Sequence, residues 1–421
     1  MKLSRPSHAL TALLAGVAVA ASCGASALPS QARTSAASTN ARAAASCGAV
    51  PNVKPDDPSG LLAKLKLPAS QYASYNGWSF PILKSAWSNW KPRHKPPYKV
   101  AVITDITNST NAAISSGILN DLKHSSIVGK VLSYTLPSAT DVTGQLQQYQ
   151  AAVQQKPDLI IFEPLSPTAA QADIVAAGKR GIPTVSVFNN IDSAYAVSIA
   201  SNPYVGAAYT ASALASTLGG KGNILQVLGA PTAETTVAEQ QAWTKVFSTC
   251  PGIKLVGQTY GFFSTALAKT QTLQWLTTNS GSVDGAIESG AMALGVLQAF
   301  QQSGRPVPVI GQIGGLQGVA QYWKAHRASG YKWAATIGGA GQLASETATV
   351  ATRILAGQGP KINFFPWNFV PFSSSEILPL ISSSWSVGSD RAINLPAADA
   401  WGTADYDRMF NEPTLTHGTR F

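Results

Sequence analysis

Polar side chains and aromatic rings follow several apolar runs of the sequence, at the points where those runs end. These positions are 107–111, 162–163, 188–190, 229–232, 260–263, 288–290 and 312–315. They carry amides, hydroxyls, glycines and aromatic rings, with few carboxylates. Amides and hydroxyls form hydrogen bonds to neutral polar groups, and ring faces stack on flat surfaces. The set predicts a binding site for a neutral, hydroxyl-rich or flat small molecule.

Groups that do covalent or metal chemistry are sparse in this chain. His94, His124, His326 and His417 are isolated, and none follows a predicted strand. The sequence has no H-E-x-x-H, G-x-S-x-G or phosphate-binding P-loop motif. Glu163 and Glu288 remain as an alternative general acid and base, but Glu163 is better explained as a hydrogen-bond acceptor for a hydroxylated ligand. We therefore expect no enzyme activity, no cofactor and no metal site.

Strand and helix patterns alternate regularly from Tyr98 onward. The run YKVAVITD predicts a first strand over 98–105, and three helices, each followed by a strand, come next before the series restarts near residue 203. This alternation predicts an α/β fold with two doubly wound parallel-sheet lobes joined by a hinge. Ligands of such sheets bind beyond the carboxyl ends of the strands, which is where the polar positions above fall.

The N-terminal segment indicates export. Lys2 and Arg5 precede an apolar run over 9–21, the pattern of a signal peptide covering residues 1–22. The run ends in Ala-Ala-Ser before Cys23, which is similar to a bacterial lipobox, so we expect lipid on Cys23. A plain secretory signal is the alternative. We expect a protein anchored to the outer face of the bacterial cell membrane, or else periplasmic or secreted.

The cysteines allow a disulfide, and the distribution of charge argues against one class of partner. If Cys23 carries lipid, Cys47 and Cys250 remain as a possible disulfide in an oxidising compartment, and the sequence leaves this pairing open. The formal net charge is +10, but the basic residues are scattered and form no basic helix or long run. We therefore expect no nucleic-acid partner.

From Lys99 to Leu380 the chain resembles the periplasmic sugar-binding proteins of bacterial ABC importers, the ribose-binding type of two-lobed solute receptor. The resemblance is carried by IIFEPLSPTAAQADIVAAGKRGIPTVSVFN, VDGAIESGAMALGVLQAFQQSGRPVPVIGQIGG and YKWAATIGGAGQLASETA. It implies the following ligand-binding residues: Asn108, Asn111, Glu163, Phe188, Asn189, Gln240, Phe262, Phe263, Ser289, Gln312 and Gln342.

The sequence departs from this family at the charged positions of a pentose site. Phe188-Asn189 stands where the family has an Asp-Arg pair, and Gln240 stands near a sugar-clamping Arg. Charge-assisted bidentate bonds give such sites much of their specificity. We therefore expect a ligand other than ribose, either a larger sugar or a ring-bearing small molecule.

The sequence pattern predicts the N-terminal segments and the extensions, and the resemblance implies the two lobes between them. The expected segments are a signal peptide (1–22), a lipid-anchored flexible tether (23–46), an aromatic and Pro-rich N-terminal extension (47–97), an N-terminal lobe (98–203, completed by about 338–360), a C-terminal lobe (204–337, completed by about 361–380) and a C-terminal extension (381–421).

The resemblance implies capture of a small molecule, expected to be a carbohydrate, by closure of two hinged lobes. The captured ligand would then pass to an ABC permease and ATPase in the membrane. A sensor that delivers the ligand to a membrane receptor is the alternative. A transcription regulator of the lactose-repressor type is excluded, because a signal peptide stands where such a protein has its helix-turn-helix.

Overall fold

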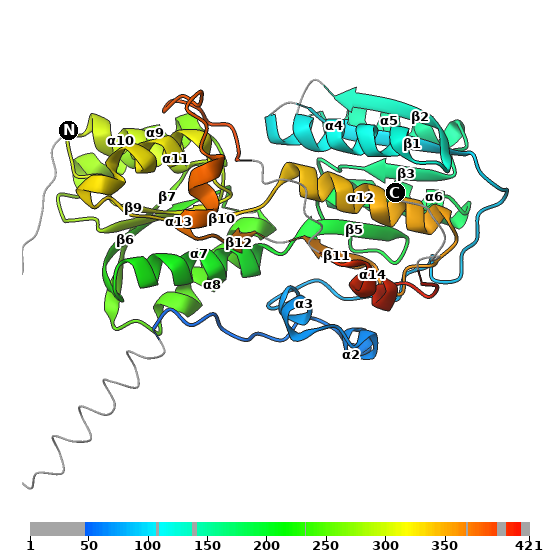
Figure 1. Ribbon diagram of the computed structural model, residues 1–421, viewed down its shortest axis with the longest axis horizontal. Helices are drawn as coiled ribbons and strands as arrows, with labels where there is room; N and C mark the ends of the chain where they lie inside the picture. Colours follow the sequence, from blue (N-terminus) through cyan, green and yellow to red (C-terminus); the bar gives the residue numbers. More distant parts are fainter. Residues whose placement is uncertain are drawn as a thin grey trace, which may run out of the picture. The chain divides into compact units, whose positions relative to one another are not determined.

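The computed structural model describes residues 47–106, 109–136, 141–231, 233–367, 369–393 and 401–413, apart from the side chain of Ser109. Figure 1 shows the two groups of strands and helices that make up this part of the chain. We call them the first lobe and the second lobe. Within the described residues, every helix is too short or too polar to cross a lipid bilayer.

The first lobe is a six-stranded parallel sheet. Its strand order is β11-β5-β4-β3-β1-β2. The strands are β1 (Tyr98–Asp105), β2 (Val128–Leu136), β3 (Leu159–Phe162), β4 (Thr184–Phe188), β5 (Ala196–Ser201) and β11 (Phe364–Trp367). Their neighbours pair in parallel throughout. The strands are nearly continuous apolar runs because helices cover both faces of the sheet.

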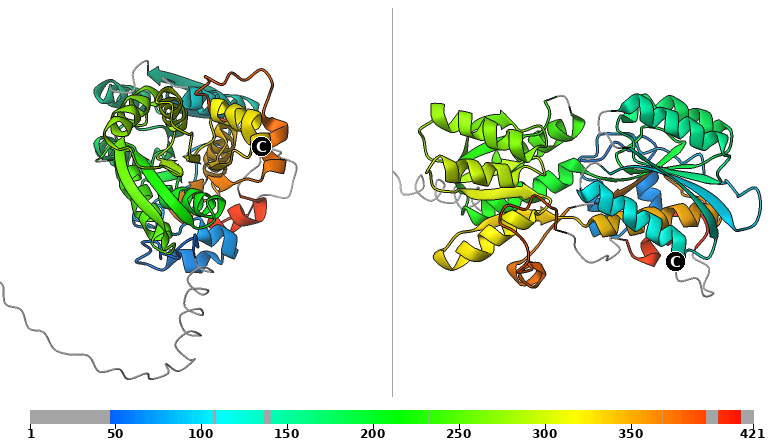
Figure 2. Two further views of the ribbon diagram at one scale, coloured as in Figure 1. Left: turned by 90° about the vertical axis from the view of Figure 1, so that its left-hand side faces the viewer. Right: turned by 90° about the horizontal axis from the view of Figure 1, so that it is seen from above.

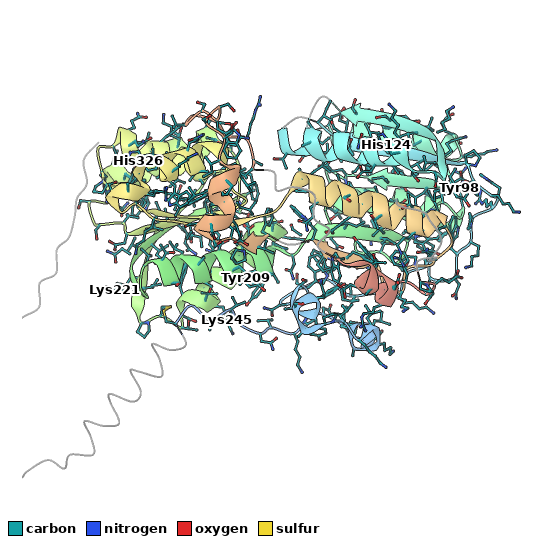
Figure 3. All side chains as sticks on the ribbon, viewed as in Figure 1. Tyr98, His124, Tyr209, Lys221, Lys245 and His326 are labelled. Atoms are coloured by element: carbon teal, nitrogen blue, oxygen red, sulfur yellow. A yellow bond between two sulfur atoms is a disulfide. The ribbon has the colours of Figure 1, made fainter. Side chains whose placement is uncertain are left out.

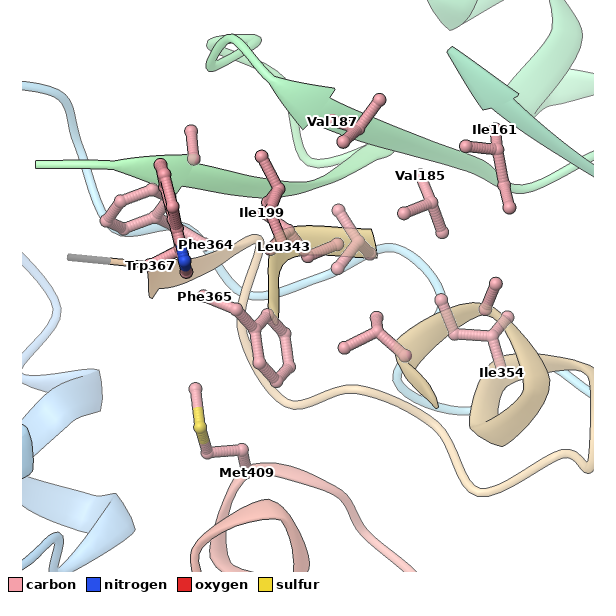
Figure 4. Close-up of a cluster of buried hydrophobic side chains, with 14 of the residues drawn as sticks. Ile161, Val185, Val187, Ile199, Leu343, Ile354, Phe364, Phe365, Trp367 and Met409 are labelled. Atoms are coloured by element: carbon pink, nitrogen blue, oxygen red, sulfur yellow. The ribbon is translucent and has the colours of Figure 1, made fainter. Parts of the chain in front are cut away.

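Four helices enclose this sheet. They are α4 (Ser109–His124), α5 (Val142–Gln154), α6 (Pro167–Lys179) and α12 (Ala340–Leu355). Alternate residues of β1 enter two cores: Val100 and Val102 pack with α4 and α12, whereas Ala101 and Ile103 pack with α5 and α6. Figure 4 shows the first of these cores, where Leu343 and Ile354 of α12 face the side chains of β4 and β5.

The second lobe repeats this plan. Its strand order is β12-β10-β9-β8-β6-β7. The strands are β6 (Lys221–Leu228), β7 (Gly252–Tyr260), β8 (Gly285–Glu288), β9 (Val309–Ile313), β10 (Trp333–Ile337) and the short antiparallel β12 (Val370–Pro371). The helices are α7 (Pro203–Thr217), α8 (Glu234–Phe247), α9 (Thr265–Thr278), α10 (Ala293–Gln302) and α11 (Gln317–His326).

Each face of the second sheet has its own helices. One core joins the sheet to α7 and α8, and another joins it to α9 and α10. Figure 2 shows the sheets of both lobes between their helices. The predicted fold class, two doubly wound parallel-sheet lobes, is confirmed.

The chain passes between the lobes at three places. These lie between β5 and α7, between β10 and α12, and between β11 and β12. Phe369, in the third passage, packs against the cores of both lobes. Its ring lies 4.9 Å from that of Trp367, and the lack of a side chain at Gly338 leaves room for both rings. Such few-residue crossings are where hinge motions of two-lobed proteins occur.

One expected boundary is wrong. Residues 361–380 were expected to complete the second lobe, but β11 pairs with β5 in the first sheet. Only the chain from β12 onward joins the second sheet, and α13 (Ser374–Ile377) and η2 (Leu378–Leu380) follow there. The sequence FFPW contains Pro366, and proline is accepted in β11 because β11 is an edge strand.

The N-terminal extension packs on both lobes. We call residues 47–78 the strap, which includes α2 (Leu61–Leu65) and α3 (Ala69–Ala73). A disulfide joins Cys47 to Cys250, the pairing that the sequence left open. Val50 and Val53 pack on the second lobe, whereas Tyr75 and Trp78 enter the core of the first.

The C-terminal extension reaches the same core of the first lobe. Helix α14 (Thr403–Met409) brings Tyr406, Met409 and Phe410 into it, and Trp401 is 1% exposed beside Tyr75. Figure 4 shows Met409 below Phe365 of β11. The two extensions therefore supply part of the hydrophobic core of the first lobe.

Candidate functional site

The carboxyl ends of β1, β3 and β4 form one edge of the first lobe. At this edge Asn111 Nδ2 donates to Asp105 Oδ2 over 3.0 Å, and Glu163 Oε2 accepts from the backbone N–H of Asp105 over 3.1 Å. Two predicted residues, Asn111 and Glu163, are thus brought together around Asp105. Asp105 is 3% exposed, and the sequence did not single it out.

Glu163 is a buried acid. Its side chain is 2% exposed, and burial raises its pKa to about 8, with a further upward contribution from the charge of Asp105. The hydrogen bond from the Asp105 N–H opposes these effects only in part. Gln145 of α5 holds the loop after Glu163 in place, because it donates to the Glu163 carbonyl and accepts from the Leu165 N–H. Glu163 is therefore a neutral acid near pH 7, able to donate as well as accept a hydrogen bond.

Phe188 and Asn189 end β4 in an unusual conformation. Phe188 has a φ of 68°, in the left-handed region that bulky residues avoid. Asn189 fixes it there: its Nδ2 donates to the Pro164 carbonyl over 2.9 Å, and its own carbonyl accepts from the Ser186 hydroxyl. Strained residues of this kind persist where surrounding contacts determine them, and they cluster at binding sites. The half-buried Phe188 ring is thereby fixed at the strand end.

Two consecutive aromatic residues mark the corresponding edge of the second lobe. Phe262 and Phe263 follow β7, both with left-handed φ angles (53° and 56°), and they are 48% and 38% exposed. The Phe263 ring lies over Gly229 at the end of β6, where a Cβ would collide with it. Exposed rings of this kind suit stacking on a ligand, and the ligand role of Phe262 and Phe263 stays a prediction.

Glu288 and Gln312 fix the loops of this second edge. Glu288 accepts backbone hydrogen bonds from Gly290, Met292 and Ile313, and burial raises its pKa to about 8 against the effect of these donors. Gln312 donates to the Gly314 carbonyl and accepts from Trp333 Nε1. Both side chains are occupied by contacts within their own lobe.

Helix α8 presents two adjacent residues in different directions. Gln240 Nε2 donates to Gln258 Oε1 on β7 over 3.0 Å, in an exposed contact. Glu239 points inward instead: it is 2% exposed and lies beside Ser289, which follows β8. The ligand role of Gln240 stays a prediction, and Glu239 is a candidate that the sequence reading missed. The signal was available, because Thr236, Glu239 and Trp243 share one face of the helix.

The remaining predicted residues fall in different places. Gln342, in the first turn of α12, accepts from Trp367 Nε1 over 3.2 Å, close to the passages between the lobes. Asn108 and Cys23 lie outside the described residues. Ser289 is 4% exposed, with its N–H bonded to the Val227 carbonyl.

Metal binding and histidine-based catalysis find little support among the described residues at these edges. Among the described residues, no three His, Cys, Asp or Glu side chains are placed to hold a metal ion. Figure 3 shows His124 on α4 and His326 on α11; both are exposed, and each contacts the backbone carbonyl four residues earlier. The one buried Lys or Arg in the described part of the chain, Arg353, pairs with Asp407. Arg353 is therefore already paired, whereas the exposed Arg391 lies beside the loop that follows β9, where its carbonyl accepts from the Gln317 N–H.

Two surface hollows, of about 620 and 550 Å³, lie elsewhere. The first is lined by residues of α2 and the segments around Lys84 and Lys361, and the second by residues around Arg327 and Phe372. Neither includes a predicted site residue. The strand ends are therefore the better candidate, because they combine fixed loops, exposed rings and buried polar groups.

The chain is similar to several known binding proteins. In curated proteins, the xylitol-binding protein of Mycolicibacterium smegmatis is 25% identical over 174 residues, which cover 41% of this chain and 50% of that protein. The chain thus matches about half the length of this relative. Its name is that of a binding protein, in agreement with the expectation that the chain is not an enzyme.

Solved structures match over most of both lobes. A solute-binding protein of an ABC transporter from Thermobispora bispora gives a TM-score of 0.60 at 22% identity, covering 74% of this chain and 94% of that one. One from Bacillus halodurans with bound myo-inositol gives 0.59 at 16% identity, covering 69% and 99%. One from Mycobacterium smegmatis with bound glycerol gives 0.58 at 17% identity, covering 69% and 98%.

A family model decides the classification. The model described as a periplasmic binding protein domain matches residues 100–359, which is more than half of the 421-residue chain. The match spans most strands of both sheets and the first two passages between the lobes. This chain belongs to the periplasmic binding protein family.

Proposed function

We propose that this chain is the extracytoplasmic solute-binding protein of an ABC importer and that it captures a neutral sugar or polyol between its two lobes. The observation that carries the proposal is the composition of the two strand-end edges. They combine buried acids with raised pKa values, such as Glu163, and exposed rings, such as Phe262, and the one buried cation of the described residues, Arg353, pairs with Asp407. Neutral acids and amides suit hydroxyl groups, which both donate and accept hydrogen bonds.

The relatives support this class of ligand. The names of three of them contain xylitol, myo-inositol and glycerol, which are uncharged and polyhydroxylated. Rings at Phe188, Phe262 and Phe263 stand at the strand ends, and their faces suit the apolar C–H face of a sugar or cyclitol ring. A sugar or cyclitol ring therefore suits this surface better than an open-chain polyol does.

Capture would proceed by hinge closure. The three passages between the lobes are short, and Phe369 packs on both cores beside them. A ligand that contacts both strand-end edges would favour the closed arrangement, which a membrane permease and ATPase would then recognise.

The N-terminal sequence supplies the proposed attachment. A signal peptide over 1–22, lipid on Cys23 and a tether over 23–46 would keep the protein at the outer face of the membrane. One acyl chain binds a bilayer only marginally, so stable attachment requires more than one chain on that cysteine. These steps rest on the sequence, and the residues concerned lie outside the described part of the chain.

A thermal-shift screen tests the proposed ligand class. The protein is heated with xylitol, myo-inositol, several hexoses, nucleosides and small aromatic compounds. A ligand that binds only the folded state raises the midpoint by an amount that grows with ligand excess over Kd. We expect a shift with at least one sugar or polyol, and a smaller shift in the double variant Phe262→Ala and Phe263→Ala.

The control variant is Val387→Ala, which removes an exposed apolar side chain elsewhere in the second lobe. It is expected to keep the full ligand-induced shift. The proposal is wrong if a charged or aromatic compound raises the midpoint and no sugar or polyol does so at millimolar concentration.

A further inference from the structure

We propose that a hollow lined by lysines on the first lobe binds a phosphate-bearing ligand, as a second site separate from the strand-end edges. We call it the lysine hollow. It is the larger of the two surface hollows, of about 620 Å³, and Lys64, Lys84, Lys91 and Lys361 are among its lining residues. This site goes beyond the proposed capture of a neutral solute and does not depend on it.

The lysine hollow is built outside the family match. Its lining residues fall within 61–65, 84–91, 361–362 and 411–412, whereas the family model matches residues 100–359. They come from the strap, the segment before β1, the segment before β11 and the C-terminal extension. Because 361–362 precede β11, the hollow lies toward the amino-terminal ends of the parallel strands, away from the carboxyl ends that form the proposed solute site.

Hydrogen bonds hold the walls of the lysine hollow in place. Asn411 Nδ2 donates to the carbonyl and hydroxyl oxygens of Ser88, over 2.7 and 2.8 Å. Lys84 pairs with Ile362 in a short antiparallel bridge. At Gly359 the chain passes so close to Ser88 that a Cβ would collide with the Ser88 carbonyl. Segments that are far apart in the sequence are therefore fixed around one hollow.

The ammonium groups of the lysine hollow are only partly neutralised. Glu412 is the one acidic residue among its described lining, and it pairs with Lys91. Lys64, Lys84 and Lys361 have no acidic side chain within ion-pair distance in the described part of the chain. Four lysines and one glutamate give the lining a net charge of +3. An anionic ligand would offset this charge.

Backbone oxygens alone hold two of these ammonium groups. Lys64 Nζ donates to the Ser59 carbonyl over 3.2 Å, and Lys361 Nζ donates to the Arg408 carbonyl over 2.6 Å. Lys361 is half-buried, and burial lowers its pKa because water around the ammonium group is partly removed. A bound anion would supply the compensating charge that Lys361 lacks within the protein.

The charge and size of the lysine hollow favour a phosphate ester over a lone carboxylate. A phosphate monoester carries about −1.5 to −2 charges at neutral pH, so one group can balance more than one ammonium group. Lysine binds phosphate as a point charge, whereas carboxylates gain most from the planar fork of arginine. Leu65 and Ile362 also line the hollow, and its volume is that of a small-molecule site. An organic group attached to the phosphate would therefore find apolar contacts.

The phosphate group could come from two sources with the same chemistry. One is a soluble phosphate ester or diphosphate, and the other is the headgroup of an anionic lipid. Calorimetry with pyrophosphate tests the first source. Sedimentation with vesicles of phosphatidylcholine, with and without phosphatidic acid, tests the second. Both measurements use the full chain, and we expect binding of pyrophosphate or a preference for the vesicles that contain phosphatidic acid.

A double variant tests the contribution of the lysines. Lys64→Gln with Lys84→Gln is expected to weaken whichever binding the parent protein shows by about tenfold or more, because two charge-assisted contacts are lost. Both side chains are exposed. Lys84→Gln alone serves if the double variant does not fold, and Lys84→Arg, which keeps the charge, is expected to retain most of the affinity.

The matched control removes two lysines elsewhere on the same lobe. Lys123 ends in the last turn of α4 and Lys179 in the last turn of α6, and both are exposed. Lys123→Gln with Lys179→Gln changes the net charge by the same amount as the lysine-hollow variant. Since salt screens distant charges, this control is expected to bind within about twofold of the parent protein.

Three results would overturn the proposal. They are no binding of either probe at millimolar concentration, unchanged binding in the lysine-hollow variant, and an equal loss in the matched control, which would make the attraction a general effect of net charge. Binding of pyrophosphate alone would assign the site to a soluble phosphate compound, and binding to phosphatidic acid vesicles alone to a lipid headgroup. Sugar and polyol binding, measured on the same variants, is expected to stay unchanged, so either proposal can fail without the other.

Discussion

Glu163 places a buried carboxyl group next to that of Asp105 at the ends of two neighbouring strands. Its folded-state pKa, about 8, lies above the ordinary value of 4.5 because burial disfavours the charged form. The folded protein therefore holds this proton more tightly than the unfolded chain does. The stability that results is fully present below about pH 4.5 and is lost as the pH rises toward 8.

This difference predicts a pH-dependent effect of Glu163→Gln. The variant cannot ionise, so its free energy of unfolding is expected to rise relative to the parent protein between pH 5 and pH 8, by up to about 1.4 kcal/mol per pH unit. Urea unfolding at pH 5, 6.5 and 8 measures the difference. Asp192→Asn, which removes an exposed carboxyl group from the same lobe, is the control. Parallel stability curves for Glu163→Gln and the parent protein would show that Glu163 ionises normally.

The candidate site residues show which features of the site can be predicted from the sequence and which cannot. Asn111 and Glu163 were predicted from their places after apolar runs, and the structure brings both next to Asp105; their ligand role stays a prediction. The sequence reading named Gln240 and not its neighbour Glu239, and one residue along a helix turns a side chain by about 100°. The packing of α8 buries Glu239 and leaves Gln240 in an exposed contact.

At the scale of elements, long periodic segments were predicted well. The run YKVAVITD coincides with β1 from Tyr98 to Asp105. Strand β5 was missed because its sequence AVSIAS alternates small and apolar residues, and its burial depends on β4, β11 and the helices that cover them. Strand β11 was missed because of Pro366, and α11 because it is short and polar.

The composition of the C-terminal extension does not show how much this segment contributes to the core of the first lobe. Trp401 is 1% exposed, its Nε1 donates to the Pro366 carbonyl over 3.0 Å, and its ring packs against Tyr75 of the strap. Trp401→Ala is expected to lower the free energy of unfolding by about 3–5 kcal/mol, as for other buried large-to-small changes. Urea unfolding followed by circular dichroism measures this loss.

Trp385 provides the matched control for this change. It is only partly buried, at the margin of a small cluster in the second lobe. Trp385→Ala is expected to cost clearly less than Trp401→Ala. Equal losses in the two variants would mean that the C-terminal extension contributes no more to the core of the first lobe than a surface aromatic residue does.

At the scale of the whole molecule, the strap is a further connection between the lobes. Its first residues are attached to the second lobe by the Cys47–Cys250 disulfide and by the bond from the Gly48 N–H to Thr249 Oγ1. Its last residues belong to the first lobe, where the Trp78 ring stacks on Phe364 at 3.8 Å. Asn202, at the passage from β5 to α7, donates to the carbonyls of Ser74 and Asn76. Motion of one lobe relative to the other must therefore displace the strap.

The disulfide is thus expected to restrict how far the lobes separate. In the double variant Cys47→Ser and Cys250→Ser, only noncovalent contacts hold the strap to the second lobe. We expect the free protein to show a larger radius of gyration by small-angle X-ray scattering than the disulfide-bonded parent, because a broader range of open arrangements becomes accessible. Saturating ligand is expected to remove the difference, since closure is determined by contacts at the strand ends. Identical scattering of the two free proteins would mean that the hinge passages alone limit the opening, and that the strap only adds stability.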